Sequence, residues 1–154
     1  MWEEMNLESS SILEKLCNER IRLNNLIEAS TLTFSDESMI ASDKILFESE
    51  SISMYLSKFS GILESLQRHA ETLPSLLEIS QTSDSVRFPK IRKFAEIIPF
   101  VLETYKSELS FKLDSFEDIS VTTDTNLYSS ILTSWKFGIY TNLSLTSLLY
   151  SFAL

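Results

Sequence analysis

Residues 45–77 read ILFESESISMYLSKFSGILESLQRHAETLPSLL. Apolar side chains recur here at intervals that alternate between three and four residues, the spacing of one face of an α-helix. The recurring positions are Ile45, Glu48, Ile52, Tyr55, Phe59, Ile62, Leu66, His69, Leu73 and Leu76. Only Glu48 and His69 interrupt the apolar row. The pattern predicts a long helix over residues 38–79 that packs like a coiled coil.

A proline near the end of this stretch bears on where the helix stops. Pro74 has no amide hydrogen, and its ring crowds the preceding turn. We therefore expect a kink at Pro74, or the end of the helix near Thr72.

A second long helix is predicted over residues 88–119, after the polar linker 80–85. Pro89 suits the first turn of a helix, where a missing amide hydrogen costs nothing. The same spacing then continues through Ile91, Phe94, Ile98, Val101 or Leu102, Tyr105, Leu109, Lys112 and Phe116. Pro99 lies inside this segment and predicts a bend.

The two ends of the chain each predict one more helix. Residues 9–28 carry an apolar row, and Ser11 and Glu14 have the spacing of a capping box. Residues 127–152 form the last predicted helix, with Trp135 near its start. No charged residue follows Lys136, so residues 137–154 are also compatible with a membrane tail, and residues 143–149 with a strand.

Composition supports the same fold class. The 154 residues include 2 glycines and 3 prolines, whereas a sheet-rich chain needs frequent turns built from such residues. We therefore expect a single all-α domain over residues 1–154, an elongated bundle of three to four long helices with coiled-coil-like packing.

Charge and cysteine content narrow the class of partner and the compartment. The formal net charge of −9 argues against nucleic acid, because phosphates must be neutralised by Lys and Arg. Cys17 is the only cysteine, so no disulfide can form within the chain and a reducing compartment is expected. The residues after Met1 do not have the pattern of a signal or transit peptide. These features predict a cytoplasmic protein.

No motif in the sequence indicates catalysis. His69 is the only histidine, and its place in the apolar row favours an ordinary hydrogen-bonded residue. Gly61 and Gly138 are isolated, so no glycine-rich phosphate loop is present. We expect no catalytic, cofactor-binding or metal-binding residues, and a protein that is not an enzyme.

The predicted role is to pack against helices of other proteins. The side chains expected to form this partner-packing seam are Ile45, Ile52, Tyr55, Phe59, Ile62, Leu66, Leu73, Ile91, Phe94, Ile98, Tyr105, Leu109 and Trp135. Apolar rows on long helices are sites at which another helix completes the packing.

The order of features over roughly residues 40–145 resembles the family of dynactin subunit 3, the small shoulder (sidearm) subunit of dynactin. A leucine-rich helix in that family is broken by a proline, as in residues 63–77. A polar link and a second proline follow, as at residues 83–89, and then a long helix. A C-terminal helix centred on tryptophan comes last, as in Ser134-Trp135-Lys136.

This resemblance implies a structural subunit without an active site or cofactor. Its partners would be dynamitin and the large microtubule-binding subunit of dynactin, in the cytoplasm and on the cytoskeleton, in support of dynein-driven microtubule transport. The residues alone leave other assemblies open, namely a kinetochore, tethering or transcription-regulatory complex. A tail-anchored membrane protein is a further alternative.

Overall fold

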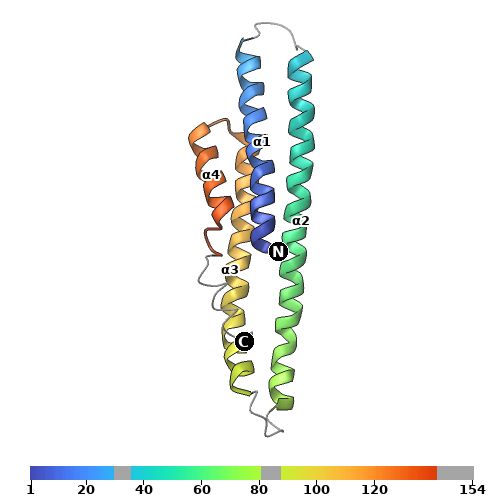
Figure 1. The fold of residues 1–154 in the computed structure, drawn as a ribbon, viewed down its shortest axis with the longest axis vertical. Coiled ribbons are helices and arrows are strands. Elements are labelled where there is room, and N and C mark those ends of the chain that lie inside the picture. The colour runs from blue at the N-terminus through green and yellow to red at the C-terminus, as the bar shows by residue number, and fades with distance from the viewer. Residues whose placement is uncertain (30–35, 81–87, 142–154) are drawn as a thin grey trace. The chain divides into compact units, whose positions relative to one another are not determined.

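A computed structural model describes residues 1–29, 36–80 and 88–141, and these residues fold into four helices without a strand. The helices are α1 (Trp2–Ala29), α2 (Asp36–Ser80), α3 (Phe88–Val121) and α4 (Thr125–Phe137). Figure 1 labels the four helices and colours them from blue at the N-terminus to red at the C-terminus. The predicted all-α bundle is confirmed.

The chain divides into two compact units. Unit 1 comprises Met1–Lys58 and Phe111–Gly138, and unit 2 comprises Phe59–Ser110 and Ile139–Leu154. Because α2 and α3 are continuous, each contributes one part to unit 1 and the other to unit 2. The expected single domain stays a prediction.

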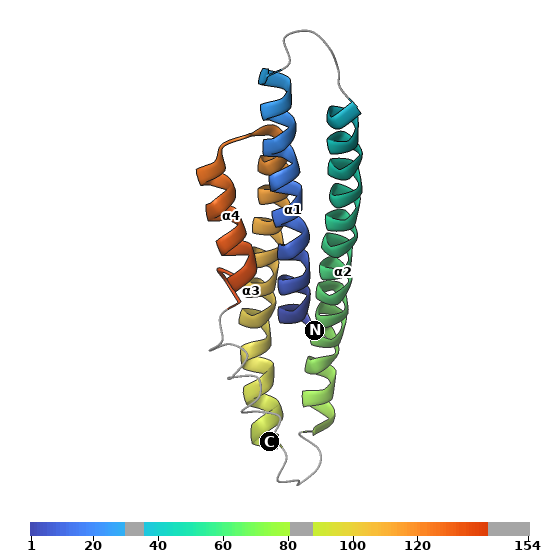
Figure 2. The same ribbon diagram turned by 45° about the horizontal axis from the view of Figure 1, so that its top comes forward.

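In unit 1, α1 and α2 run antiparallel, as the side-chain contacts between them show. Tyr55 of α2 donates a hydrogen bond to Glu8 of α1 at 2.9 Å, and Lys44 pairs with Glu19 at 3.2 Å. As α1 advances from Glu8 to Glu19, α2 therefore runs back from Tyr55 to Lys44. Figure 2 shows α4 against α1 on the side away from α2.

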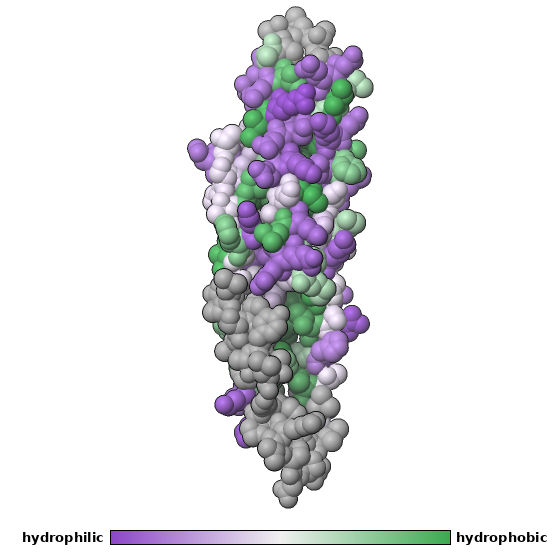
Figure 3. Space-filling model, viewed as in Figure 1, coloured by the Kyte–Doolittle hydropathy of each residue, from purple (hydrophilic) through white to green (hydrophobic). Residues whose placement is uncertain are grey.

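The core of unit 1 combines apolar side chains from all four helices. Its buried apolar members are Trp2, Met5, Leu13, Leu16, Cys17, Ala41, Ile52, Leu56, Ile119, Tyr128, Ile131 and Trp135. On the face seen in Figure 3, hydrophilic side chains predominate over α1 and the adjoining part of α2, with hydrophobic ones between them.

Unit 2 is built from the second part of α2 and the first part of α3. Phe59, Val101 and Leu109 are its buried apolar side chains among the described residues. The buried carboxylate of Glu108 accepts a hydrogen bond from the Tyr140 backbone amide at 3.0 Å. This bond ties the segment that follows α4 to α3.

Helix α1 begins at Trp2, seven residues before the predicted start. The prediction that Ser11 caps the helix is therefore wrong. Ser9 and Ser10 lie inside the helix, and their hydroxyls donate to the carbonyls of Met5 and Leu7 at 2.6 and 2.8 Å. Because these bonds satisfy the hydroxyls within the helix, the serines continue α1 instead of capping it.

Both internal prolines are accommodated within their helices. Helix α2 continues through Pro74 to Ser80, so its predicted end near Thr72 is wrong. Pro99 likewise lies inside α3. Both prolines are exposed, and water can therefore bind the carbonyl that loses its intrahelical donor.

Helix α4 is shorter than predicted, because it ends at Phe137 and not near residue 152. The Asp124 carboxylate caps its start by accepting from the amides of Asn126 and Leu127 at 2.8 and 3.4 Å. Gly138 ends it with φ of 66°, a backbone conformation that glycine adopts without steric cost. The strand alternative for residues 143–149 lies outside the described residues, as does the membrane-tail alternative for residues 137–154 from residue 142 on.

Candidate protein-interaction surface

Among the side chains that the structure describes, four of the thirteen predicted seam residues are buried within the chain's own fold. Ile52, Phe59, Leu109 and Trp135 are buried, and Leu66 is exposed. The partly exposed members are Ile45, Tyr55, Ile62, Leu73, Phe94, Ile98 and Tyr105. The Ile91 side chain lies outside the described residues. The four buried residues thus belong to the intramolecular core, and partner contact by the remaining members stays a prediction.

Trp135 is the centre of a buried polar cluster in unit 1. Its indole Nε1 donates to Ser9 Oγ at 2.9 Å. The Nζ of Lys112, also fully buried, donates to the Trp135 carbonyl at 3.1 Å and lies 4.6 Å from the centroid of the indole ring. The carbonyl belongs to the last turn of α4, where a cation is favoured. This cluster joins α1, α3 and α4.

Removal of the Ser9 hydroxyl tests this cluster. We expect Ser9→Ala to lower the free energy of unfolding by about 1–3 kcal/mol, because the buried indole N–H loses its acceptor. Ser10→Ala is the matched control, since Ser10 bonds only to a carbonyl within its own helix. Urea unfolding followed by circular dichroism measures both. Equal stability losses in the two variants would contradict this role of Ser9.

A second link joins α1 to the connection between α3 and α4. Arg20 Nη2 donates to the Ser120 carbonyl at 2.7 Å, and Arg20 Nε donates to Tyr128 Oη at 3.3 Å. The Tyr128 hydroxyl in turn donates to the Thr122 carbonyl. Arg20 therefore places a cation at the C-terminal end of α3, whose own last turn has no basic residue.

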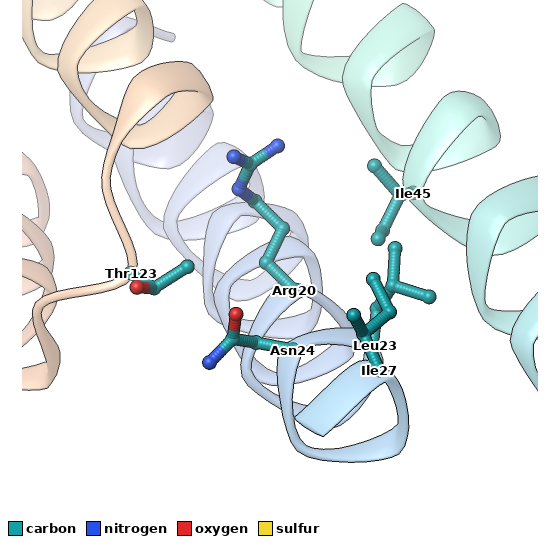
Figure 4. A pocket seen from close by; sticks show the side chains of 6 residues that line it. All are labelled: Arg20, Leu23, Asn24, Ile27, Ile45 and Thr123. Atoms are coloured by element: carbon teal, nitrogen blue, oxygen red, sulfur yellow. The ribbon is translucent and has the colours of Figure 1, made fainter. Parts of the chain in front are cut away.

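A pocket of about 190 Å³ lies beside Arg20, lined by Arg20, Leu23, Asn24, Ile27, Ile45 and Thr123. Leu23 and Ile27 of α1 face Ile45 of α2, and Thr123 lies on the other side of Arg20 (Figure 4). The lining has no carboxylate, thiol or imidazole. The Arg20 guanidinium is already held by its hydrogen bonds to Ser120 and Tyr128. The pocket therefore presents mainly side chains that could pack against an apolar group.

Cys17 is buried, and its thiol is free. Burial raises its pKa from the ordinary 9.0 to about 11, and nearby Arg20 offsets only part of this effect. The neutral thiol therefore dominates at physiological pH, and we expect the residue to be unreactive.

Thiol labelling checks this assignment. At pH 8 we expect Cys17 in the folded chain to react with a disulfide reagent at least about 100-fold more slowly than in urea, since a pKa two units higher leaves about 100-fold less thiolate. Cys17→Ser/Ser11→Cys, which moves the thiol to an exposed position on α1, should react quickly when folded. Rapid labelling of the folded wild-type chain would contradict the burial.

His69 is exposed on α2, and its Nδ1 lies 2.6 Å from the Ser65 carbonyl, an ordinary bond within the helix. Within residues 1–29, 36–80 and 88–141, no three His, Cys, Asp or Glu side chains are grouped so that they could hold a metal ion. No helix in that part of the chain is both long and apolar enough to cross a membrane.

The first five turns of α2 carry large apolar side chains on the side away from the core. They are Met39, Ile40, Leu46, Phe47 and Met54, each at least half exposed. Ile40, Phe47 and Met54 are seven residues apart, as are Met39 and Leu46. Residues seven apart lie about 20° apart around an α-helix, so these side chains form two longitudinal rows.

An acidic row runs between these apolar rows. Asp36, Asp43 and Glu50 are exposed and also seven residues apart. At 100° per residue, Asp43 lies about 40° from Met39 and about 60° from Ile40 around the helix. In the part of the chain that the structure describes, none of the three carboxylates is within ion-pair distance of a basic side chain. These eight residues are called the outer face of α2.

The outer face of α2 was not predicted, although its pattern is present in the sequence. The stretch 36–58 contains two seven-residue apolar patterns on different sides of one helix. The seam through Ile45 and Ile52 continues into the following turns, whereas the row through Ile40 and Phe47 ends at Met54. The longer pattern turned out to be the inner one.

Comparison of the chain with protein-family models and with curated proteins gave no match.

Proposed function

We propose that this protein is a non-catalytic structural subunit of a multiprotein complex, and that the outer face of α2 receives a helix of another subunit. The observation that carries the proposal is the set of five large apolar side chains that the chain's own helices leave at least half exposed along one face. Large apolar side chains that are exposed together along one helix, with polar side chains beside them, are a feature of protein-binding sites.

Leaving the apolar side chains of this face in water costs free energy. Covering one half-exposed side chain of this size contributes roughly 1 kcal/mol to the free energy of binding. A partner helix that covers all five therefore gains several kcal/mol before the cost of association is subtracted. The spacing of seven residues repeats about every 10.5 Å, the repeat that a second helix can follow.

For the identity of the complex we propose dynactin, with this chain in the position of the small shoulder subunit. The support is the order of sequence features: a leucine-rich helix that contains Pro74, a next helix that starts at Phe88-Pro89, and a last helix that carries Trp135. Dynamitin and the large microtubule-binding subunit are then the partners. The protein would act in the cytoplasm on the cytoskeleton, in dynein-driven transport.

Affinity purification of the full chain at native expression level, followed by mass spectrometry, tests this proposal. We expect dynamitin and the large microtubule-binding subunit in constant stoichiometry. Recovery of a kinetochore, tethering or transcription-regulatory complex would replace dynactin and keep the structural-subunit role. Recovery of the chain alone, as a monomer, would overturn both.

A variant of two exposed residues tests whether the partners bind to the outer face of α2. Phe47→Ser/Met54→Ser alters two exposed side chains, so its thermal melt should match that of the wild type, while the co-purified subunits are lost. Phe100→Ser/Phe137→Ser changes two exposed aromatic residues elsewhere and should retain them. If the outer-face variant keeps its partners, binding occurs at another surface.

A further inference from the structure

We propose that the outer face of α2 is specific for a basic amphipathic helix, one with Arg or Lys at every seventh position and apolar side chains beside it. This inference rests on the proposed function, because it takes the same face as the binding surface. It adds the chemistry of the partner, which the apolar rows alone do not define.

The acidic row supplies the charge complementarity. Asp36, Asp43 and Glu50 lie between the apolar rows, so a helix that covers those rows must pass over the carboxylates. An apolar partner would bury them without counter-charges, which is costly. Arg and Lys avoid this cost, since their aliphatic stems pack on apolar neighbours while the charged end reaches the acid.

The charge of the chain favours the same partner at long range. With a formal net charge of −9, the protein attracts a basic segment and speeds its encounter with the face. The two basic side chains on this part of α2 are already used elsewhere, because Lys44 pairs with Glu19 and Lys58 lies 4.7 Å from the centroid of the Tyr55 ring. The basic groups must therefore come from outside this helix.

A second copy of the chain is a poorer occupant. In a twofold-symmetric dimer through this face, the acidic rows of both copies would meet, and like charges in such a contact are destabilising. The matching surface therefore belongs to a different protein.

Binding of designed helices to the intact chain tests the inference. The probe is a fluorescent peptide of three heptads with Arg at every seventh position and leucines beside it, measured by anisotropy at low salt. We expect Asp43→Asn/Glu50→Gln to weaken its binding by roughly two- to thirtyfold, the range for two exposed charge pairs. A peptide with Glu in place of Arg should not bind.

The matched control removes the same charge from other helices. Glu14→Gln/Glu103→Gln also neutralises two exposed carboxylates and should change binding by less than about twofold. Equal binding of the Arg peptide to wild type and to Asp43→Asn/Glu50→Gln would overturn the inference. Loss of native partners from Phe47→Ser/Met54→Ser would still support the proposed function, so the two failures are distinguishable.

Sedimentation of the chain alone tests whether a second copy of the chain binds the outer face of α2. We expect a monomer at concentrations that bind the Arg peptide. A dimer that is lost in Phe47→Ser/Met54→Ser and strengthened in Asp43→Asn/Glu50→Gln would overturn the basic partner and assign the face to a second copy.

Discussion

Trp135→Ala is expected to lower the free energy of unfolding by about 3–5 kcal/mol, a large part of the 5–15 kcal/mol that is typical of a whole domain. Trp135 is fully buried, and its removal leaves a cavity where α1, α3 and α4 meet. The change also removes the indole ring beside Lys112 and the donor to Ser9. Urea unfolding followed by circular dichroism measures the loss.

Phe137→Ala is the control for this variant. Phe137 lies two residues further along α4 and is 72% exposed. Removal of its ring leaves the core intact, so a change within about 0.5 kcal/mol is expected. Similar losses from Trp135→Ala and Phe137→Ala would show that α4 does not depend on Trp135 for its packing.

Phe59→Asp is expected to prevent stable folding of unit 2. Phe59 is fully buried, so the substitution loses about 3–5 kcal/mol of packing. It also places a carboxylate in an apolar site, which costs several kcal/mol more unless the acid takes up a proton. Reduced helicity at 222 nm and faster proteolysis within residues 59–110 are the expected results.

Phe100→Asp is the matched change on the surface of the same unit. Phe100 is 65% exposed, and a charge there remains in water. We expect helicity and proteolysis like those of the wild type. An intact Phe59→Asp chain would mean that this side of α2 does not face a core.

Most of the fold could be predicted because the helical period is strong in the middle of the chain. The predicted ranges 38–79 and 88–119 differ from α2 and α3 by at most two residues at each end. The start of α1 was missed because Asn6, Ser9 and Ser10 are buried polar residues, which weaken the apolar pattern of its first turns. The end of α4 was missed because uncharged residues continue past Gly138, and one glycine is a weak stop signal among them.

The candidate site was harder to predict, for a physical reason. Periodicity shows which residues share a side of a helix, but not whether that side contacts the same chain or another one. Ile52, Phe59, Leu109 and Trp135 were expected to pack on a partner, and the chain's own helices cover them. The outer face of α2 has the same seven-residue spacing, and only the fold separates it from the inner side.

The proposed function rests on the claim that α2 has two sides, one that packs into the chain's own core and one that a partner helix covers. Hydroxyl-radical footprinting of the isolated chain and of the purified native complex distinguishes these two sides. We predict that Met39, Phe47 and Met54 are readily oxidised in the isolated chain and protected in the complex, with Phe59 protected in both. Equal oxidation of Met39, Phe47 and Met54 in the two samples would contradict the claim.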